Sequence, residues 1–399
     1  MLIQNCAFAV TQNKKREVLE NVDVRIKEGR IVEIGKKLSE KGEEMLKGQG
    51  KILLPGLINA HTHLGMGSLR GLYDDQELDE WLGYIKAAEG KFTAEEVGES
   101  VKRGCQESLR FGTTTLFDSY RLFPEKVKKV LQESKLRVFY SASKSNKKIV
   151  ELLKGSGITP VLSAHSVHTH KEYSEDEATL KEIQALSKKH TLLKMMHIGE
   201  TRLERFKTLE ATGKLPIEYL ESLGFLDEKA LLIHCIWLTK AELKLIAKRG
   251  AKVIHCPISN MKTSSGGVMP LLEMWAAGVT VGLGTDSVVS NNNLDMFEEM
   301  KVCALLHKQH RWDPAAVSAQ KVLDMATVEN AKCLGIEKEV GSIELGKKAD
   351  LILLNIGLHL EPCTKKNVVS HLVYAVQGSD INDVIVEGKS VLRDQKFVE

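Results

Sequence analysis

The chain has 399 residues, 43% of them hydrophobic, which is enough for one large barrel with an appendage or for two domains. Its 56 basic and 53 acidic residues nearly balance, and no Lys/Arg block with interleaved aromatic residues occurs, so neither nucleic acid nor an anionic membrane is indicated as a partner. The seven cysteines are scattered and form no Cys-x-x-Cys pair, a usage that predicts free thiols in the reducing cytoplasm. We expect no signal peptide and no membrane-spanning segment.

The two ends of the chain have the alternating pattern of antiparallel strands. A hairpin is predicted over Val22–Ile34, with a tight Glu28-Gly29 turn, and a similar hairpin over Val384–Val391. Neither end has enough apolar surface for a core of its own. We therefore expect residues 1–50 and 341–399 to join into one small composite β-sandwich.

Residues 51–340 alternate short apolar runs with helical patterns, which is typical of βαβ units and a parallel sheet. Eight strands over this length fit a (β/α)8 TIM-type barrel. A doubly wound open sheet is the competing architecture, but no Gly-x-Gly-x-x-Gly follows an early strand. The predicted strands are Ile52–His63, Thr113–Asp118, Arg137–Ala142, Thr159–His165, Thr191–His197, Ala230–His234, Ala251–Cys256 and Val279–Asp286.

Three of the intervening helices are predicted to begin with capping boxes, in which a Ser or Thr is followed three residues later by Glu. These are Thr93 with Glu96, Ser174 with Glu177, and Thr239 with Glu242. The last of these helices is expected to end at Gly250.

His61 and His63 end the first predicted barrel strand in the tripeptide His-Thr-His. Side chains on a strand alternate between its two faces, so both imidazoles point the same way. Two ligands of one metal ion need this geometry, because their nitrogens must converge on a point about 2 Å away.

Polar residues end the other predicted strands as well. Because barrel enzymes place their sites where the C-terminal strand ends meet, we expect these side chains to converge. A satisfied buried histidine is the alternative for any one of them, but together with a carboxylate they have the composition of a hydrolytic zinc site. The residues are His61 and His63 on strand one, His165, His197 and His234 on strands four to six, His255 on strand seven, and Asp286 on strand eight.

Further polar and thiol groups lie beside these strand ends. Glu200 follows His197 by three residues and is either a proton carrier over the metal or a solvated loop residue. Cys235 and Cys256 are either thiolate ligands or small buried residues. Ser287 begins a polar turn that can line a pocket.

These motifs together resemble the amidohydrolase superfamily. The similarity rests on Pro55–His63, His197-x-x-Glu200, His234, Leu283–Asp286 and the tail Gly341–Leu351, and it covers essentially the whole chain. Within the superfamily the chain looks most like the mononuclear branch with adenosine-type, S-adenosylhomocysteine and methylthioadenosine deaminases. Binuclear members carry a carboxylated lysine on strand four, which has no lysine here. The resemblance therefore implies one divalent ion, zinc in the first place and iron as the alternative.

The resemblance also implies roles for individual residues. His61, His63, His197 and Asp286 would bind the metal, and His234 would orient the nucleophilic water. Asp286 would accept the proton of that water, because a divalent metal lowers the pKa of bound water towards about 7. Glu200 would protonate the ring nitrogen beside the attacked carbon, and ammonia would leave.

The substrate-binding residues implied by the resemblance are Trp81, Glu89, His165 and Ser287. Glu89 would take the two ribose hydroxyls and His165 would touch the purine, although a helix-surface acid and a packed histidine are the alternatives. Deaminases that accept S-adenosylhomocysteine use arginines at the end of strand three and in the following loop. This chain has serines there, with Lys144 or Lys147 as substitutes.

We therefore expect a cytoplasmic deaminase of adenosine-like nucleosides that acts on small molecules. 5′-Deoxyadenosine and 5′-methylthioadenosine are favoured over S-adenosylhomocysteine. The competing enzyme hypothesis is a deaminase of a free base or heterocycle such as guanine, cytosine, a pterin or a triazine, which does not need Glu89. A non-catalytic barrel scaffold is the third hypothesis. A homo-oligomer is compatible with the sequence.

Overall fold

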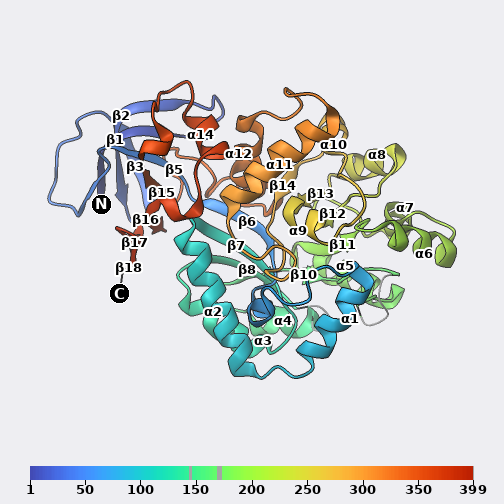
Figure 1. The fold of residues 1–399 in the computed structure, drawn as a ribbon. Helices are drawn as coiled ribbons and strands as arrows, with labels where there is room; N and C mark the ends of the chain where they lie inside the picture. The colour runs from blue at the N-terminus through green and yellow to red at the C-terminus, as the bar shows by residue number, and fades with distance from the viewer. Residues whose placement is uncertain (143–145, 169–172, 399) are drawn as a thin grey trace.

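A barrel of parallel strands forms the centre of the computed structural model, which describes residues 1–142, 146–168 and 173–398 (Figure 1). Its strands pair in chain order, in one sheet of four and one of five. The sheets meet at strand four, where the Val161 N–H donates to the Tyr140 carbonyl at 2.9 Å. The Asp286 N–H donates to the His61 carbonyl at 3.0 Å and joins the last strand to the first. The (β/α)8 prediction is confirmed. The strands are β6 (Leu57–Thr62), β7 (Thr113–Ser119), β8 (Arg137–Ser141), β9 (Thr159–Pro160), β10 (Leu162–Ser163), β11 (Lys194–Ile198), β12 (Ala230–His234), β13 (Lys252–His255) and β14 (Val281–Leu283).

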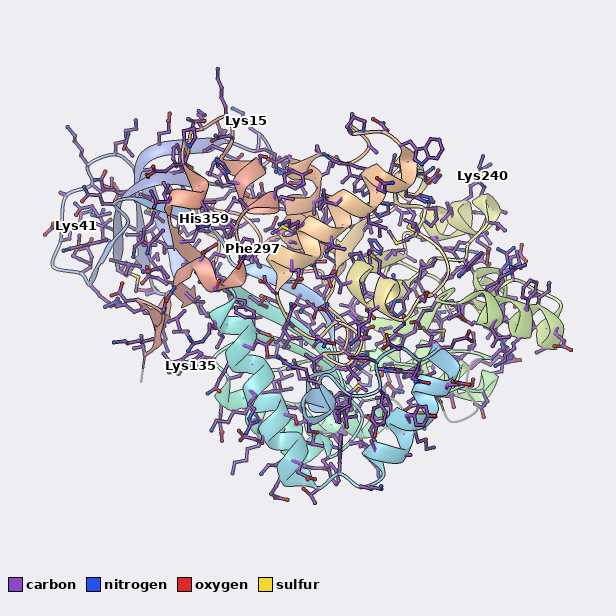
Figure 2. The ribbon with its side chains drawn as sticks, in the orientation of Figure 1. Lys15, Lys41, Lys135, Lys240, Phe297 and His359 are labelled. Atoms are coloured by element: carbon purple, nitrogen blue, oxygen red, sulfur yellow. The ribbon has the colours of Figure 1, made fainter. Side chains whose placement is uncertain are left out.

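Helices connect the strands and cover the outside of the barrel (Figure 1). Apolar side chains of the strands, among them Phe117, Met195 and Ile233, fill the barrel interior. The labelled lysines Lys15 and Lys240 lie on the exposed outside, whereas Phe297 is buried (Figure 2). The helices are α1 (Leu78–Glu89), α2 (Ala94–Arg110), α3 (Pro124–Glu133), α4 (Asn146–Leu152), α5 (Glu177–His190), α6 (Arg202–Thr212), α7 (Pro216–Ser222), α8 (Lys240–Arg249), α9 (Pro257–Lys262), α10 (Leu271–Ala276), α11 (Met296–Arg311), α12 (Ala319–Ala326), α13 (Val328–Cys333) and α14 (Val368–Tyr374), with 3-10 turns at Leu64–Leu69, Leu358–Leu360 and Gly378–Asp380.

A mainly antiparallel sheet of nine strands, built from both ends of the chain, lies beside the barrel (Figure 1). Apolar residues of both ends, such as Val24, Leu46 and Ile385, share one core, as expected for two segments that cannot each bury enough surface alone. Its path is β18-β17-β16-β15-β5-β1-β2-β3, with β4 paired to β1. The strands are β1 (Leu2–Val10), β2 (Val18–Lys27), β3 (Arg30–Gly35), β4 (Met45–Lys47), β5 (Lys51–Pro55), β15 (Leu351–Asn355), β16 (Ile381–Val386), β17 (Lys389–Arg393) and β18 (Lys396–Phe397).

Two predicted barrel strands are wrong in their extent. The run Ile52–His63 is two strands, because β5 belongs to the terminal sheet and only β6 belongs to the barrel. The chain changes sheet at Gly56, where a Cβ atom would lie 2.7 Å or less from three side-chain atoms of Thr114. The run Thr159–His165 is likewise divided at Val161, where it joins the two halves of the barrel.

The predicted helix starts are confirmed at two of three places. Thr93 with Glu96 and Thr239 with Glu242 form capping boxes, and Gly250 ends α8 with a φ of +69°. The prediction at Ser174 is wrong, because Asp176 caps α5 by accepting the Thr179 N–H at 2.8 Å. Asp is among the best N-cap residues and stands directly before the helix.

Candidate metal centre and active site

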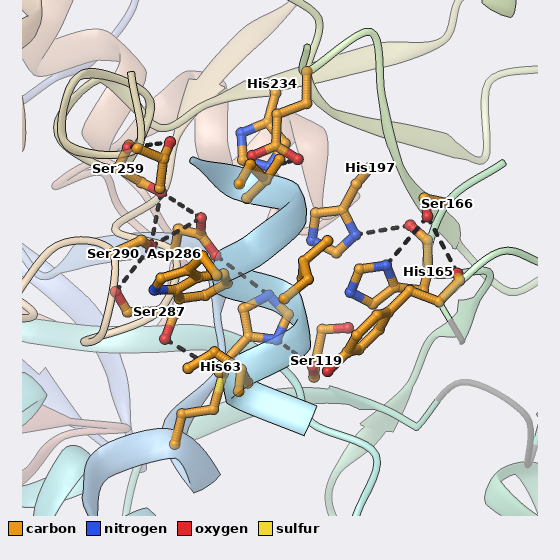
Figure 3. Close-up of a pocket in the computed structure, with 18 of the residues that line it drawn as sticks. His63, Ser119, His165, Ser166, His197, His234, Ser259, Asp286, Ser287 and Ser290 are labelled. Atoms are coloured by element: carbon orange, nitrogen blue, oxygen red, sulfur yellow. Dashed lines mark hydrogen bonds and ion pairs between the residues drawn. The ribbon is translucent and has the colours of Figure 1, made fainter. Parts of the chain in front are cut away.

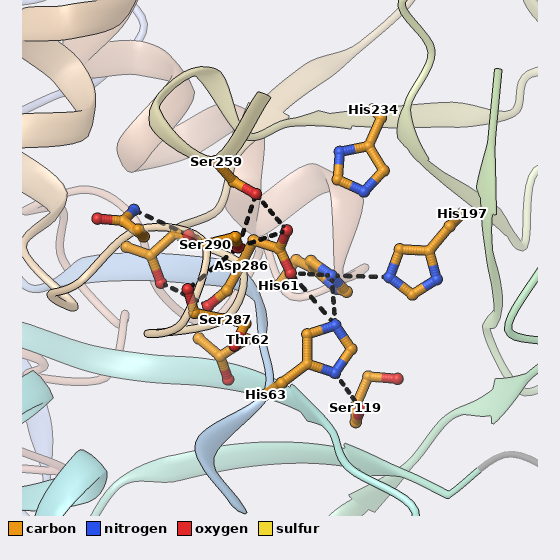
Figure 4. A network of polar contacts seen from close by, with 12 residues as sticks. His61, Thr62, His63, Ser119, His197, His234, Ser259, Asp286, Ser287 and Ser290 are labelled. Carbon is orange, nitrogen blue, oxygen red and sulfur yellow. Dashed lines mark hydrogen bonds and ion pairs between the residues drawn. The ribbon is translucent and has the colours of Figure 1, made fainter. Parts of the chain in front are cut away.

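Four ligand-type side chains from three places on the barrel rim converge on one point (Figure 4). The Nε2 atom of His61 lies 3.1 Å from the Nε2 atoms of His63 and His197. The Asp286 Oδ1 atom lies 3.4 Å and 3.3 Å from the Nε2 atoms of His61 and His63. Three imidazole nitrogens so close together cannot all donate to one another, and a shared cation satisfies them jointly.

The outer nitrogens of two of these histidines determine which nitrogen faces the centre. His63 Nδ1 donates to the Ser119 carbonyl at 2.6 Å, and His197 Nδ1 donates to the His165 carbonyl at 2.8 Å. Each Nε2 atom therefore presents its lone pair inwards, as in metal-binding histidines. The donor set of three imidazoles and one carboxylate thus fits a divalent ion.

Burial favours the neutral form of His61 and His197, which is the form that binds metals. It lowers the pKa of His61 to about 4, and it lowers the pKa of His197 well below its ordinary value with help from neighbouring histidines. Burial also acts to lower the pKa of His63, but the Asp286 carboxylate outweighs it and the pKa is raised. Burial of Asp286 acts to raise its pKa, yet the adjacent imidazoles of His61 and His63 hold it well below the usual range.

The remaining predicted catalytic groups face the same space. The Glu200 carboxylate approaches His234 Nε2 at 3.6 Å, and His234 Nδ1 is 2.8 Å from the amide oxygen of Asn260. His234 and Asp286 have φ angles of +73° and +61°, in the left-handed region that non-glycine residues rarely adopt. Strained residues of this kind cluster at active sites.

Asp286 is held by hydroxyl groups on its other oxygen. Ser259 at the start of α9 donates to Asp286 Oδ2 at 2.6 Å, and Ser290 donates to it at 3.3 Å. Oδ1 is left facing the histidines. The two serines therefore orient the carboxylate towards the candidate metal position.

A pocket with an empty volume of about 900 Å³, including its mouth, opens above this centre (Figure 3). Apolar residues of α1, among them Trp81 and Ile85, line it together with His165 and Ser287. All four predicted substrate contacts, Trp81, Glu89, His165 and Ser287, thus lie in its wall. Desolvation of the half-buried His165 ring lowers its pKa well below the ordinary value, and the ring lies 4.6 Å from that of His197.

Glu89 is buried and does not lie on the helix surface. It accepts a hydrogen bond from Arg121 Nη2 at 2.5 Å, and the Tyr173 hydroxyl lies 3.5 Å from the same oxygen. The guanidinium of Arg121 lies over the Tyr173 ring at 4.8 Å. The cluster places a charged, hydrogen-bonding group in an otherwise apolar part of the pocket.

Arg121, Glu204 and Ser259 were not predicted from the sequence. Arg121 follows strand two, so the rule that site residues end barrel strands points to it. Glu204 lies three residues after Thr201, in the first turn of α6, and this spacing is the pattern of a capping box directly after Glu200. Ser259 has no comparable signal.

His255 points away from the centre. Its Nε2 atom lies 3.2 Å from His307 Nε2 on α11, with Cys303 beside the pair. We interpret this group as a buried hydrogen-bonded histidine pair. Cys235 and Cys256 are buried outside the cluster of ligand atoms.

Known proteins provide an independent comparison. The model of the amidohydrolase family matches residues 52–391. The chain belongs to the amidohydrolase family. It is 37% identical to a 5′-deoxyadenosine deaminase of Methanosarcina barkeri, over 100% of this chain and 94% of that protein. It is 38% identical to a 5-methylthioadenosine/S-adenosylhomocysteine deaminase of Thermococcus onnurineus, over 97% and 93% of the two chains.

The solved structure of an adenosine deaminase from Xanthomonas campestris with bound zinc has the same amidohydrolase fold. It superimposes with a TM-score of 0.91 at 29% identity, over 100% of this chain and 94% of that one. This zinc-bound neighbour and the His-His-His-Asp group indicate a divalent metal in this amidohydrolase. Among the described residues, no helix combines the length and apolar composition needed to cross a membrane. All seven cysteines have free thiols, as predicted.

Proposed function

We propose that this amidohydrolase is a metal-dependent deaminase of adenosine-like nucleosides, with 5′-deoxyadenosine and 5′-methylthioadenosine as its preferred substrates. The observation that carries the proposal is the convergence of His61, His63, His197 and Asp286 below a pocket that also contains Glu200 and His234. The deaminase names of its relatives support hydrolysis of a carbon–nitrogen bond. The free thiols favour the cytoplasm as its compartment.

His61, His63, His197 and Asp286 are proposed to hold one divalent ion, with zinc preferred over iron because the zinc-bound neighbour shares the fold. Such an ion, when bound, makes water nucleophilic at neutral pH by lowering its pKa towards about 7. Ser259 and Ser290 keep the Asp286 carboxylate directed at this point.

The chain's own residues then account for the proton transfers. His234, with Nδ1 turned to Asn260, directs Nε2 into the pocket and accepts a hydrogen bond from the attacking water. Asp286 takes the proton that this water loses. Glu200 gives a proton to the ring nitrogen next to the amino-bearing carbon. The water oxygen adds to that carbon, and Asp286 passes the proton it took to the amino nitrogen. The bond between carbon and amino nitrogen breaks and ammonia leaves. The proton from Glu200 stays on the ring nitrogen, and the remaining hydroxyl proton returns to Glu200 as the carbonyl forms.

Glu89 is the proposed contact for the ribose. Its Oε2 atom accepts a hydrogen bond from Arg121, and its Oε1 atom is the proposed acceptor for the ribose hydroxyls. The apolar wall formed by Trp81 and Ile85 suits a small uncharged 5′ group such as methyl or methylthio. His165 is placed to contact the purine.

S-Adenosylhomocysteine finds less support as a substrate. Lys147 is exposed and pairs with Glu182 at 3.1 Å, and it is not among the residues that line the pocket. Lys144 lies outside the described residues. We propose that the amino-acid carboxylate of this larger substrate is recognised poorly.

Ammonia release from a panel of purines, pyrimidines and nucleosides tests the proposal. We expect turnover of 5′-deoxyadenosine and 5′-methylthioadenosine to exceed that of S-adenosylhomocysteine and of free adenine. A preference for guanine, cytosine, a pterin or a triazine over every adenosine would reject the nucleoside assignment and leave the metal site in place. Absence of turnover in metal-loaded protein would favour a scaffold.

A further inference from the structure

We propose that Glu204 is a positioning residue for Glu200, holding the backbone of the loop that carries this proton donor. The role of Glu200 in this inference rests on the proposed function, whereas the hydrogen bonds of Glu204 are observed in the structure and do not depend on that function. Glu204 lies on α6, just beyond the strand that supplies His197, and is only 2% exposed.

The carboxylate of Glu204 accepts two successive backbone N–H groups. Oε1 accepts from Gly199 at 3.0 Å and Oε2 accepts from Glu200 at 2.9 Å. The Gly199 carbonyl is held on its other side by the N–H groups of Ile236 at 2.9 Å and Trp237 at 2.8 Å. Gly199 has a φ of +62°, a conformation that glycine adopts readily. The peptide before Glu200 is therefore clamped from both sides.

Two other helices of the chain show what Glu204 does differently. α2 and α8 also begin with Thr-x-x-Glu, and there Glu96 and Glu242 each bond back to the N–H of their own N-cap threonine at 2.8 Å. In α6, the Thr201 hydroxyl accepts the Glu204 N–H at 3.1 Å, which is one of the two hydrogen bonds of a capping box. The Glu204 side chain, however, reaches past Thr201 to the two residues before it. Its hydrogen bonds therefore serve the loop of Glu200.

This arrangement affects chemistry because a general acid must stay within hydrogen-bond reach of the atom it protonates. Glu200 lines the pocket and approaches His234 at 3.6 Å. Its loop lies between the candidate metal ligand His197 and α6, so a shift of the Gly199–Glu200 peptide moves the carboxyl group directly. Misplacement by about 1 Å can lower a rate by about 10²-fold.

Kinetics of Glu204→Gln in metal-loaded protein test the proposal. The amide replaces one acceptor oxygen by a donor, so one N–H group loses its partner. We expect kcat to fall by about 10–100-fold while KM and metal content stay near wild type. Because Glu204 acts only through Glu200, the double variant Glu200→Gln/Glu204→Gln should be no slower than Glu200→Gln alone. Glu204→Asp, which keeps the carboxyl group but loses reach, should also lose kcat.

Glu242→Gln is the matched control. Glu242 is likewise a buried glutamate on the first turn of a helix, and its oxygens accept the N–H groups of Ile217 at 3.1 Å and Thr239 at 2.8 Å. It does not line the pocket, so its loss should reduce stability without reducing kcat. An equal loss of kcat in Glu242→Gln, or losses that multiply in the double variant, would overturn the proposal.

Hydrogen exchange of the backbone amides separates this inference from the proposed function. In Glu204→Gln, or in Glu204→Asp if the first variant does not fold, exchange should accelerate in the peptide spanning residues 198–201. The same peptide should be unchanged in Glu242→Gln. This result requires no substrate, so it holds even if the panel reveals a different activity. Unchanged exchange in folded Glu204 variants would refute the clamp.

Discussion

His63 and His197 turn their Nδ1 atoms to backbone carbonyls, and this contact decides the chemistry of the centre at the scale of single residues. A neutral histidine whose outer nitrogen donates a hydrogen bond has the lone pair of its inner nitrogen available for a cation. The orientation of these two rings therefore follows from contacts with the protein backbone. Removing one of the four ligand side chains leaves three, which are expected to hold the metal ion less tightly.

The metal assignment leads to the first prediction. His197→Ala or Asp286→Ala should lose both metal and turnover, because each removes one of four donors. Wild-type protein should contain about one divalent ion per chain by elemental analysis. His255→Ala is the control, since His255 lies outside the centre, and it should keep its metal. A fully active preparation without metal would contradict the assignment.

The second prediction separates proton transfer from metal binding. Glu200 lies beside His234 and outside the group of ligand atoms. Glu200→Gln should keep its metal yet lower kcat by about 10²–10⁴-fold, the range for a positioned general acid. Metal content and kcat are measured on the same preparation. Loss of metal would mean that Glu200 is a ligand.

The third prediction concerns substrate choice. Glu89→Ala leaves the ribose hydroxyls without their partner, and each lost bond to a charged group is worth about 1.5–3 kcal/mol. We expect kcat/KM for ribonucleosides to fall at least tenfold, whereas a 2′,3′-dideoxyadenosine should hardly change. An equal decrease for both substrates would instead indicate a structural effect of leaving Arg121 without its partner.

At the scale of elements, the closure of the barrel places Asp286 opposite His61. β14 and β6 approach so closely at Gly284 that an added Cβ would lie 2.8 Å from His61 Cβ and 2.9 Å from its backbone nitrogen. Only glycine allows this approach. The close approach of β6 and β14, which brings His61 and Asp286 together, thus depends on Gly284, a residue with no side chain.

The fourth prediction follows from this contact. Gly284→Ala should push β14 from β6, reduce stability by about 1–3 kcal/mol and weaken metal binding. Gly83→Ala, in α1, is the control because a Cβ there meets no atom within 4 Å and alanine favours helix. Denaturation curves and metal titrations of both variants provide the measurement. Unchanged metal affinity in Gly284→Ala would show that the rim tolerates displacement.

At the scale of the whole molecule, an ion pair between half-buried Arg137 and buried Asp350 joins the barrel to the terminal sheet. Arg137 at the start of β8 binds Asp350, which precedes β15, through Nε at 3.1 Å and Nη2 at 3.0 Å. Asp350 also accepts the Glu387 N–H at 2.8 Å. Burial raises the pKa of Asp350, although Arg137 acts to lower it. The pair therefore links segments more than 200 residues apart in the chain.

The fifth prediction is that Arg137→Met loses about 3–5 kcal/mol of stability near pH 7, because it leaves the buried carboxylate of Asp350 without its cationic partner. Without Arg137 the pKa of Asp350 rises further. An acid whose folded pKa is raised loses stability as pH rises from its unfolded value, about 3.9, towards its folded value. The deficit should therefore be small near pH 4 and full near pH 7, as measured by denaturation. Arg103→Met, which removes an exposed pair with Glu99, should change stability by less than about 0.5 kcal/mol at either pH. A deficit that does not vary with pH would contradict this account.

Local patterns in the sequence were enough to predict the barrel, the terminal hairpins and two of three capping boxes. They also identified the residues that now lie around the centre, since His61, His63, His197, His234 and Asp286 all stand at strand ends. This works because strand alternation and the position of C-terminal strand ends follow from backbone geometry alone. The same rule selected His255, whose side chain turns outwards to His307.

Contacts between distant segments decided the rest. An apolar run such as Ile52–His63 has the same sequence pattern whether it forms one strand or two. Its division at Gly56 follows from pairing with different strands, β15 before that residue and β7 after it. The pairing of Arg121 with Glu89 and the reach of Glu204 to Gly199 depend on how the elements pack. The periodicity of apolar residues in the sequence indicates which face of a helix or strand is buried. The position of a side chain relative to the site depends instead on closure of the barrel and on contacts with residues distant in the chain, which no local pattern specifies.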